Sequence, residues 1–208
     1  MTKPHPGRRL RARPLRGTPE ETRGRLVAAA AEAFNRRGYH GTDSNRIARD
    51  AGYAAGTFYK HFSDKRAILL AAYEDWVGAE WRAVEAELAV EGSREEVAAR
   101  IVALVLRHHL RWRGLRSSMA ALLGEDAEVR RFHREQRRRQ LALLRGIRRR
   151  AQEPPRAAEE DAVLLFTLER VCDAIANGEV RDLALRRERV LGELRRAIAA
   201  ALRSPRSR

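Results

Sequence analysis

Prolines divide this chain into two long stretches that contain none. The seven prolines occupy positions 4, 6, 14, 19, 154, 155 and 205, which leaves residues 20–153 and 156–204 without proline. Because proline lacks a backbone N–H and clashes with the preceding helical turn, its absence permits long helices. Apolar residues recur at spacings of three and four, and no segment alternates with period two. The sequence therefore predicts an all-α fold.

The composition indicates a folded chain that stays in water. It has 208 residues, of which 44% are hydrophobic and 34% charged, enough for one large domain or two small ones. The longest apolar run, residues 67–73, is far shorter than the roughly 20 residues that cross a bilayer, and no signal stretch precedes it. The single cysteine, Cys172, excludes an internal disulfide and a multi-cysteine metal site. We expect a cytoplasmic protein without metal or cofactor.

The net charge of +15 favours a polyanionic partner such as nucleic acid or an acidic membrane surface. Residues 1–66 hold 15 basic and 6 acidic side chains, whereas residues 67–208 hold 28 and 22. The first third is therefore the part expected to face the polyanion. Compositional drift is an alternative source of the surplus, because 40 of the 43 bases are arginine and alanine is abundant, as a GC-rich genome would dictate.

The N-terminal residues predict a basic arm followed by a capped helix. Residues 1–17 carry six bases, no acid and three prolines, so we expect them to be disordered. Thr18 then caps a helix, Pro19 fills its first turn, and Glu21 completes a capping box. We expect this helix to end at Gly38.

Two short helices joined by a glycine turn come next. Thr42 begins the first helix, and Gly52 supplies the positive φ for a sharp turn into the second, at about residues 54–60. Ser63 caps the helix that follows. Two short helices behind a supporting helix, within a basic region, are typical of a helix-turn-helix motif, whose second helix enters the DNA major groove.

The rest of the chain predicts a larger helical body. The helix after Ser63 either continues to about residue 90 or breaks near Gly78. Ser93 and Glu96 form a second capping box, which opens a helix that ends by Gly114. Further helices are expected at about 115–123, 126–151, 157–177 and 187–203.

The segment from Gly38 to Lys65, GYHGTDSNRIARDAGYAAGTFYKHFSDK, resembles the DNA-binding segment of the TetR family of bacterial transcriptional repressors. The remaining 140 or so residues resemble that family only in their helical layout. The matching positions are Gly38-Tyr39, Thr42, Ile47-Ala48, Ala51-Gly52, Gly56-Thr57-Phe58-Tyr59, His61-Phe62 and Lys65.

This resemblance implies a homodimeric repressor rather than an enzyme. Such a protein binds a palindromic operator in double-stranded DNA and leaves it when a small-molecule effector binds. The implied parts are the arm at 1–17, a helix-turn-helix DNA-binding domain at 18–65 and a ligand-binding and dimerisation body at 66–208.

The resemblance also implies which residues contact DNA. Thr42 suits a phosphate oxygen, although a capping role alone would also explain it. Asn45 could reach a base edge and Arg46 a phosphate, or both could point to solvent. Lys65 opposes the dipole of the helix that it begins, so a phosphate partner would explain it. The predicted contacts are Thr42, Asn45, Arg46, Ala55, Gly56, Thr57, Tyr59, Lys60, His61 and Lys65.

Three positions depart from the family pattern. The family usually has serine or threonine where Ala54 stands and aliphatic residues where Ser44 and Tyr53 stand. Packing beneath the second short helix must therefore differ. Ala55 and Gly56 offer almost no hydrogen-bonding side chain, so phosphate contacts and DNA shape carry more of the recognition, and the operator cannot be deduced.

Apolar stripes on the last two long helices predict the dimer interface. They are too extensive for one protomer to cover, so we expect a four-helix bundle between two copies. The stripes are Leu164, Leu168, Val171 and Ile175, and Val190, Leu194, Ile198 and Leu202.

The arginine-rich helix at 126–151 has two uncharged amides in the middle of its apolar stripe. A cavity with a few orienting polar groups would require such an interruption, although bonds to a neighbouring helix would explain it equally. Aromatic groups on other helices could complete the walls. The predicted effector-binding residues are His108, Trp112, Gln136, Gln140 and Phe166.

Two other functions compete with a regulator. The sequence shows no arrangement of residues that would make this chain an enzyme. His108 and His109 point about 100° apart on a helix, and Cys172 has no activating neighbour. A non-regulatory DNA-binding protein, such as a packaging protein, would need charge alone. It would not need about 130 residues of helical body.

Overall fold

The computed structural model describes residues 17–152 and 156–202, and this part of the chain is helical without strands, as predicted. Of the expected arm at residues 1–17, only residue 17 belongs to the described part. No helix in these ranges combines the length and apolar content that a membrane span requires. The ten helices are α1 (Pro19–Arg37), α2 (Ser44–Asp50), α3 (Ala55–His61), α4 (Lys65–Leu88), α5 (Arg94–Arg111), α6 (Arg113–Leu123), α7 (Ala127–Arg150), α8 (Ala158–Ala176), α9 (Glu179–Asp182) and α10 (Arg187–Ala201).

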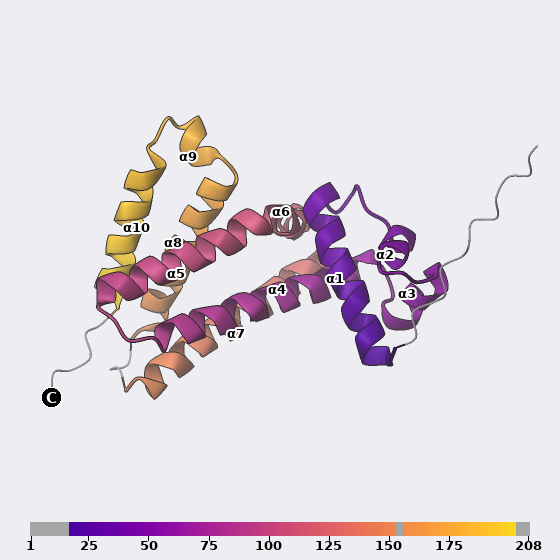
Figure 1. The fold of residues 1–208 in the computed structure, drawn as a ribbon, viewed down its shortest axis with the longest axis horizontal. Coiled ribbons are helices and arrows are strands. Elements are labelled where there is room, and N and C mark those ends of the chain that lie inside the picture. Colours follow the sequence, from indigo (N-terminus) through magenta and orange to yellow (C-terminus); the bar gives the residue numbers. More distant parts are fainter. Residues whose placement is uncertain (1–16, 153–155, 203–208) are drawn as a thin grey trace, which may run out of the picture.

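The molecule is elongated, with a small group of helices at each end. Figure 1 shows α1, α2 and α3 together at one end and α8, α9 and α10 at the other, with α4, α5 and α7 running between them. The helix α4 is continuous through Gly78, so the longer of the two predicted helices is the one formed. The short helix α9 was not predicted. It follows Gly178, whose φ of 85° reverses the chain after α8.

Helix caps account for where most helices begin. The boxes of Thr18 with Glu21 and of Ser93 with Glu96 form as predicted. Two other predicted caps are wrong by one residue. Asp43 replaces Thr42 at the start of α2, accepting the Arg46 amide at 2.8 Å, and Asp64 replaces Ser63 at the start of α4, accepting the Ala67 amide at 2.7 Å. A carboxylate binds these amides more strongly because it also meets the positive end of the helix dipole.

Two hydrophobic cores lie along the length of the molecule. The first is formed by α1–α4, α6 and the beginning of α7, around Phe34, Phe58 and Met119. The second is formed mainly by α5, α8 and α10, around Val102 and Leu194, with the last turns of α4 packed against it. Because α4 contributes to both cores, it ties the two ends of the molecule together.

The predicted reason for a dimer needs correction. Ile175, Leu194 and Ile198 are buried against α5 in the second core of the same protomer, and the rest of the two stripes packs partly against it. The sequence pattern identified the apolar faces, but α5 supplies a third apolar face that covers them. The large apolar side chains that α8 does expose are Val163 and Phe166.

A close approach of two backbones fixes the junction between α5 and α6. The prediction that Gly114 ends α5 is wrong, because Gly114 is the second residue of α6 and faces α1. A Cβ atom at this position would lie 1.9 Å from the backbone oxygen of Asn35. Only glycine fits at this point without moving α1 or α6.

We expect Gly114→Ala to lower the free energy of unfolding by about 1–3 kcal/mol, because the added methyl group overpacks a backbone contact. Urea denaturation followed by circular dichroism measures this change. The matched control is Gly24→Ala, at an exposed position in α1 with no atom within 4 Å of the added Cβ. The control should raise stability by up to about 1 kcal/mol. Equal stability of the two variants would contradict the close approach.

Candidate nucleic-acid interface and effector cavity

The helices α2 and α3 form a tight pair on the surface of α1. The turn between them contains Gly52 at φ 81°, and the Tyr53 amide donates to the Ala48 carbonyl at 2.8 Å. Ile47 from α2 and Phe58 from α3 are fully buried beneath the pair. This is the helix-turn-helix arrangement that the glycine spacing predicts.

Six of the ten predicted DNA contacts are exposed on this pair. Tyr59 is 57% exposed, which is unusual for a large aromatic side chain, and its ring rests edge-on against Phe58. Thr57, His61 and Lys65 are half-buried. The exposed members are Asn45, Arg46, Ala55, Gly56, Tyr59 and Lys60.

Thr42 and Lys65 hold the loop before α2 in place. Thr42 is only 3% exposed and its hydroxyl donates to the Ala33 carbonyl at 3.4 Å, so its side chain is turned away from the surface. The Lys65 ammonium donates to the carbonyls of Tyr39 and Thr42, both at 2.9 Å, and lies 4.0 Å from the centre of the Tyr39 ring. Burial lowers the pKa of Lys65. These contacts explain a lysine at the start of α4 without a phosphate, and one of its three N–H groups remains for the predicted DNA contact.

The unusual residues at positions 53 and 54 have different structural roles. Tyr53 is buried, and its hydroxyl accepts a hydrogen bond from the Arg25 guanidinium at 3.1 Å. A tyrosine here therefore adds a polar link between the turn and α1 that an aliphatic residue would lack. Ala54 occupies the cap position of α3 and provides no side-chain hydrogen bond, as its residue type predicts.

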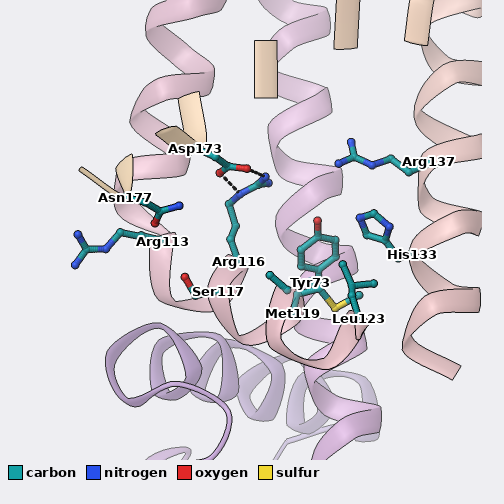
Figure 2. A pocket seen from close by; sticks show the side chains of 11 residues that line it. Tyr73, Arg113, Arg116, Ser117, Met119, Leu123, His133, Arg137, Asp173 and Asn177 are labelled. Atoms are coloured by element: carbon teal, nitrogen blue, oxygen red, sulfur yellow. Dashed lines mark hydrogen bonds and ion pairs between the residues drawn. The ribbon is translucent and has the colours of Figure 1, made fainter. Parts of the chain in front are cut away.

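A cavity of about 260 Å³ lies in the body between α4, α6, α7 and the end of α8. Figure 2 shows the Arg116 guanidinium paired with Asp173, with Arg113 and Asn177 on one side of the pair and Tyr73, His133 and Arg137 on the other. Apolar side chains of α6 complete the wall. The lining residues are Tyr73, Arg113, Arg116, Ser117, Met119, Ala120, Leu123, His133, Arg137, Asp173 and Asn177.

The five residues predicted to bind an effector lie outside this cavity. Gln136 donates to Glu74 of α4 at 3.3 Å, and Gln140 accepts from Arg137 at 3.1 Å, so hydrogen bonding within the body explains both amides. Phe166 is 50% exposed beneath the Arg137 guanidinium. Trp112 packs against the first core and His108 is half-buried on α5.

A buried charged cluster adjoins the cavity. Arg116 donates to both carboxylate oxygens of Asp173, at 2.7 and 2.5 Å, and the Nδ1 atom of His109 lies 2.9 Å from the same carboxylate. Burial raises the pKa of Asp173, but the contacts with His109 and Arg116 outweigh it and lower the pKa to about 2. Asp173 is therefore ionised across the physiological range.

The environment of Glu80 in α4 favours a neutral carboxyl group, unlike that of Asp173. It is 4% exposed, and its Oε2 atom lies 3.7 Å from the Nε2 atom of His109, beyond hydrogen-bonding distance. Burial raises the pKa of Glu80 to about 8, with Glu169 adding to the effect. Burial also lowers the pKa of His109. At neutral pH the Glu80 carboxyl is therefore mainly protonated.

Sequence reasoning missed the polar residues that line the cavity. The sequence predicts no function for the short helix that carries Arg113 and Arg116, and none for Asp173. One signal was available: Arg113, Arg116 and Ser117 occupy one face of α6 at spacings of three and four. Their partners on α4, α7 and α8 lie far away in the sequence, so the signal does not predict the cavity.

The helix α6 contacts both the cavity and the DNA-binding end. The Asn35 side chain donates to the Arg111 carbonyl at 2.8 Å and accepts from the amides of Gly114 and Leu115, at 2.9 and 3.3 Å. Ser118 adds a hydrogen bond to the Phe34 carbonyl at 3.4 Å. One face of α6 is thus fixed to α1 while another face lines the cavity.

The raised pKa of Glu80 predicts a pH dependence of stability. Its folded-state pKa of about 8 exceeds the ordinary value of 4.5, so the folded state binds this proton more tightly than the unfolded chain. The resulting stability is complete below the ordinary value and is lost as the pH rises through about 8. Glu80→Gln cannot ionise. We expect it to exceed the parent chain in free energy of unfolding by on the order of 2 kcal/mol near pH 9.

Urea denaturation from about pH 5 to 9 measures this difference. The control is Asp75→Asn, which removes an exposed carboxylate from the same helix and should leave the pH profile unchanged. A parallel pH dependence in Glu80→Gln and the parent would contradict the assignment.

Comparisons with known proteins identify the DNA-binding end. Residues 26–72 match the model for bacterial regulatory proteins of the tetR family. The HTH-type transcriptional activator FasR of Mycolicibacterium smegmatis is 42% identical over 55 residues, which are 26% of this chain and 25% of FasR. The matched segments span only 20–44% of the curated relatives' lengths.

Solved structures match over nearly the whole chain. A TetR-family transcriptional regulator from Rhodococcus sp. superimposes with a TM-score of 0.71 at 19% identity, covering 88% of this chain and 100% of that one. The regulator FadR from Bacillus subtilis, in complex with stearoyl-CoA, gives a TM-score of 0.61 at 17% identity, covering 86% and 99%. At these identities the likeness concerns the fold. The match at residues 26–72 identifies the DNA-binding end as that of the tetR family of bacterial regulatory proteins, and the rest of the chain shares the fold of TetR-family regulators.

Proposed function

We propose that this regulator binds a palindromic DNA operator as a homodimer and leaves it when a small molecule occupies the cavity beside Arg116 and Asp173. In this proposal α3 enters the major groove, with Tyr59 and Lys60 contacting the DNA. Residues 18–65 act as the DNA-binding domain and residues 66–208 as the body that binds the effector and dimerises.

The observation that carries the proposal is the double role of α6. The same short helix supplies Arg113 and Arg116 to the cavity and is hydrogen-bonded to Asn35 of α1. A ligand that shifts α6 therefore acts directly on the helix that supports α2 and α3. Coupling requires that the ligand bind the two positions of α6 with different affinity.

Two further observations support the finer parts of the proposal. Val163 and Phe166 lie exposed on α8, at the end of the molecule away from α1, and a second copy would cover them. The stearoyl-CoA bound to FadR of Bacillus subtilis shows that a similar fold takes a small ligand. FasR of Mycolicibacterium smegmatis is an activator, so a transcription assay with the operator distinguishes repression from activation by this chain.

We expect Tyr59→Ala to weaken operator binding at least fivefold and Lys60→Gln to reduce the salt dependence by about one phosphate contact. Fluorescence anisotropy with fragments selected from the native genome measures both effects. The control is Arg189→Gln, which removes the same charge from the exposed surface of α10. Equal loss of affinity in the control, or equal binding to any duplex, would favour a non-regulatory DNA-binding protein.

The three hydrogen bonds of the Asn35 side chain predict how the cavity is coupled to DNA binding. Asn35→Ala removes all three hydrogen bonds at the junction, so we expect it to bind the operator but to release it less completely when an effector binds. Asn35→Asp is the matched variant, because its carboxylate still accepts from Gly114 and Leu115 at a helix start. It should retain most of the response. A full response in a folded Asn35→Ala protein would show that coupling follows another route.

A further inference from the structure

One cation of the cavity, Arg113, has no carboxylate partner in the part of the chain that the structure describes. Asp173 pairs with Arg116, and Glu169 lies 2.5 Å from the Arg137 guanidinium. Arg113 contacts no acid within the described residues, and its hydrogen bond to the Ala176 carbonyl is long, at 3.4 Å. The lining therefore has an excess positive charge at Arg113, which is exposed and so lies at the mouth of the cavity.

The inner wall of the cavity carries an unused hydrogen-bond donor. Tyr73 is only 5% exposed, yet its hydroxyl lines the cavity and has no hydrogen-bond partner among the described residues. Figure 2 shows this hydroxyl on the opposite side of Arg116 from Arg113. Burial raises the pKa of Tyr73, so the group stays a neutral donor. The hydroxyl is therefore available to donate to a ligand or a water molecule in the cavity.

The size of the cavity limits what can occupy it. A volume of about 260 Å³ lies just below the range of about 300–1,000 Å³ that is usual for ligand sites. At about 30 Å³ for each water-sized group, it holds on the order of ten non-hydrogen atoms. A long acyl chain would not fit without enlarging it. Met119, Ala120 and Leu123 provide one apolar wall for the middle of a ligand.

We propose that the effector is a compact organic anion whose oxyanion group pairs with Arg113 and whose other end accepts a hydrogen bond from Tyr73. The guanidinium forms paired hydrogen bonds with a carboxylate or a phosphate, and the apolar wall contacts a short or aromatic body between the two ends. This inference rests on the proposed role of the cavity and names the class of ligand for it.

Three probes of the same shape test the charge requirement. 4-Hydroxybenzoate, 4-hydroxybenzamide and 4-hydroxybenzamidine share a ring and a hydroxyl group and differ in carrying a negative, neutral or positive end. Titration calorimetry with the full chain in low chloride should give at least tenfold tighter binding for the benzoate than for the other two. Phenyl phosphate, titrated in parallel, distinguishes a carboxylate from a phosphate ligand.

Two substitutions locate the binding site. Arg113→Gln should remove the preference for the anion. Tyr73→Phe, which deletes only the hydroxyl, should weaken the binding of 4-hydroxybenzoate at least fivefold. Arg107→Gln is the control, because Arg107 is exposed on α5 and lies outside the cavity. It should leave the affinity unchanged, and thermal unfolding without ligand shows whether each variant is folded.

The outcomes separate this inference from the proposed function. The inference would be overturned if the three probes bound equally, if 4-hydroxybenzamidine bound best, or if neither anion bound at millimolar concentration. It would also be overturned if the Arg113→Gln protein kept the parent's preference for the anion. Operator binding without a probe tests the DNA-binding function independently. Tight anion binding that leaves operator affinity unchanged would support the anion site and contradict its role in DNA release.

Discussion

The hydrogen bonds of the Asn35 side chain hold together the two parts of the structure. They satisfy the last carbonyl of α5 and two of the free amides of α6, groups that would each cost about 1–3 kcal/mol if they were buried without partners. This arrangement needs α1 and α6 to approach so closely that Gly114 cannot carry a side chain. The position of α6, and with it the wall of the cavity, follows from this contact.

The body also contains a group of charged side chains among its helices, and their desolvation costs free energy. Glu169 forms an ion pair with Arg137, and Asp173 forms one with Arg116. The Arg116 guanidinium also lies 5.0 Å from the centre of the Trp76 ring. Such pairs add little net stability, because desolvation cancels much of their attraction. Their effect is to fix geometry, since breaking one pair leaves an uncompensated charge. They hold α6, α7 and α8 in one relative position around the cavity.

Local signals in the sequence were sufficient for the helix-turn-helix motif and for every described helix except the short α9. Capping boxes, glycine turns and the absence of proline act within a few residues, so Thr18, Gly52 and Ser93 could be interpreted directly. The cavity could not be predicted, because Tyr73, Arg116 and Asp173 meet only after α4, α6 and α8 have packed. The apolar stripe that includes Leu194 shows the same limit. Periodicity reveals a buried face but not whether α5 or a second protomer covers it.

The continuity of α4 has a mechanical consequence. A helix of 24 residues is about 36 Å long, comparable to the distance between successive major grooves on one face of DNA. Because this rigid rod begins beside α3 and ends in the second core, rotation about one end is magnified at the other. A tilt of about 5° displaces the far end by about 3 Å, as far as one hydrogen bond is long. In the proposed function, small rearrangements in the body would therefore be converted into displacements large enough to break contacts with DNA.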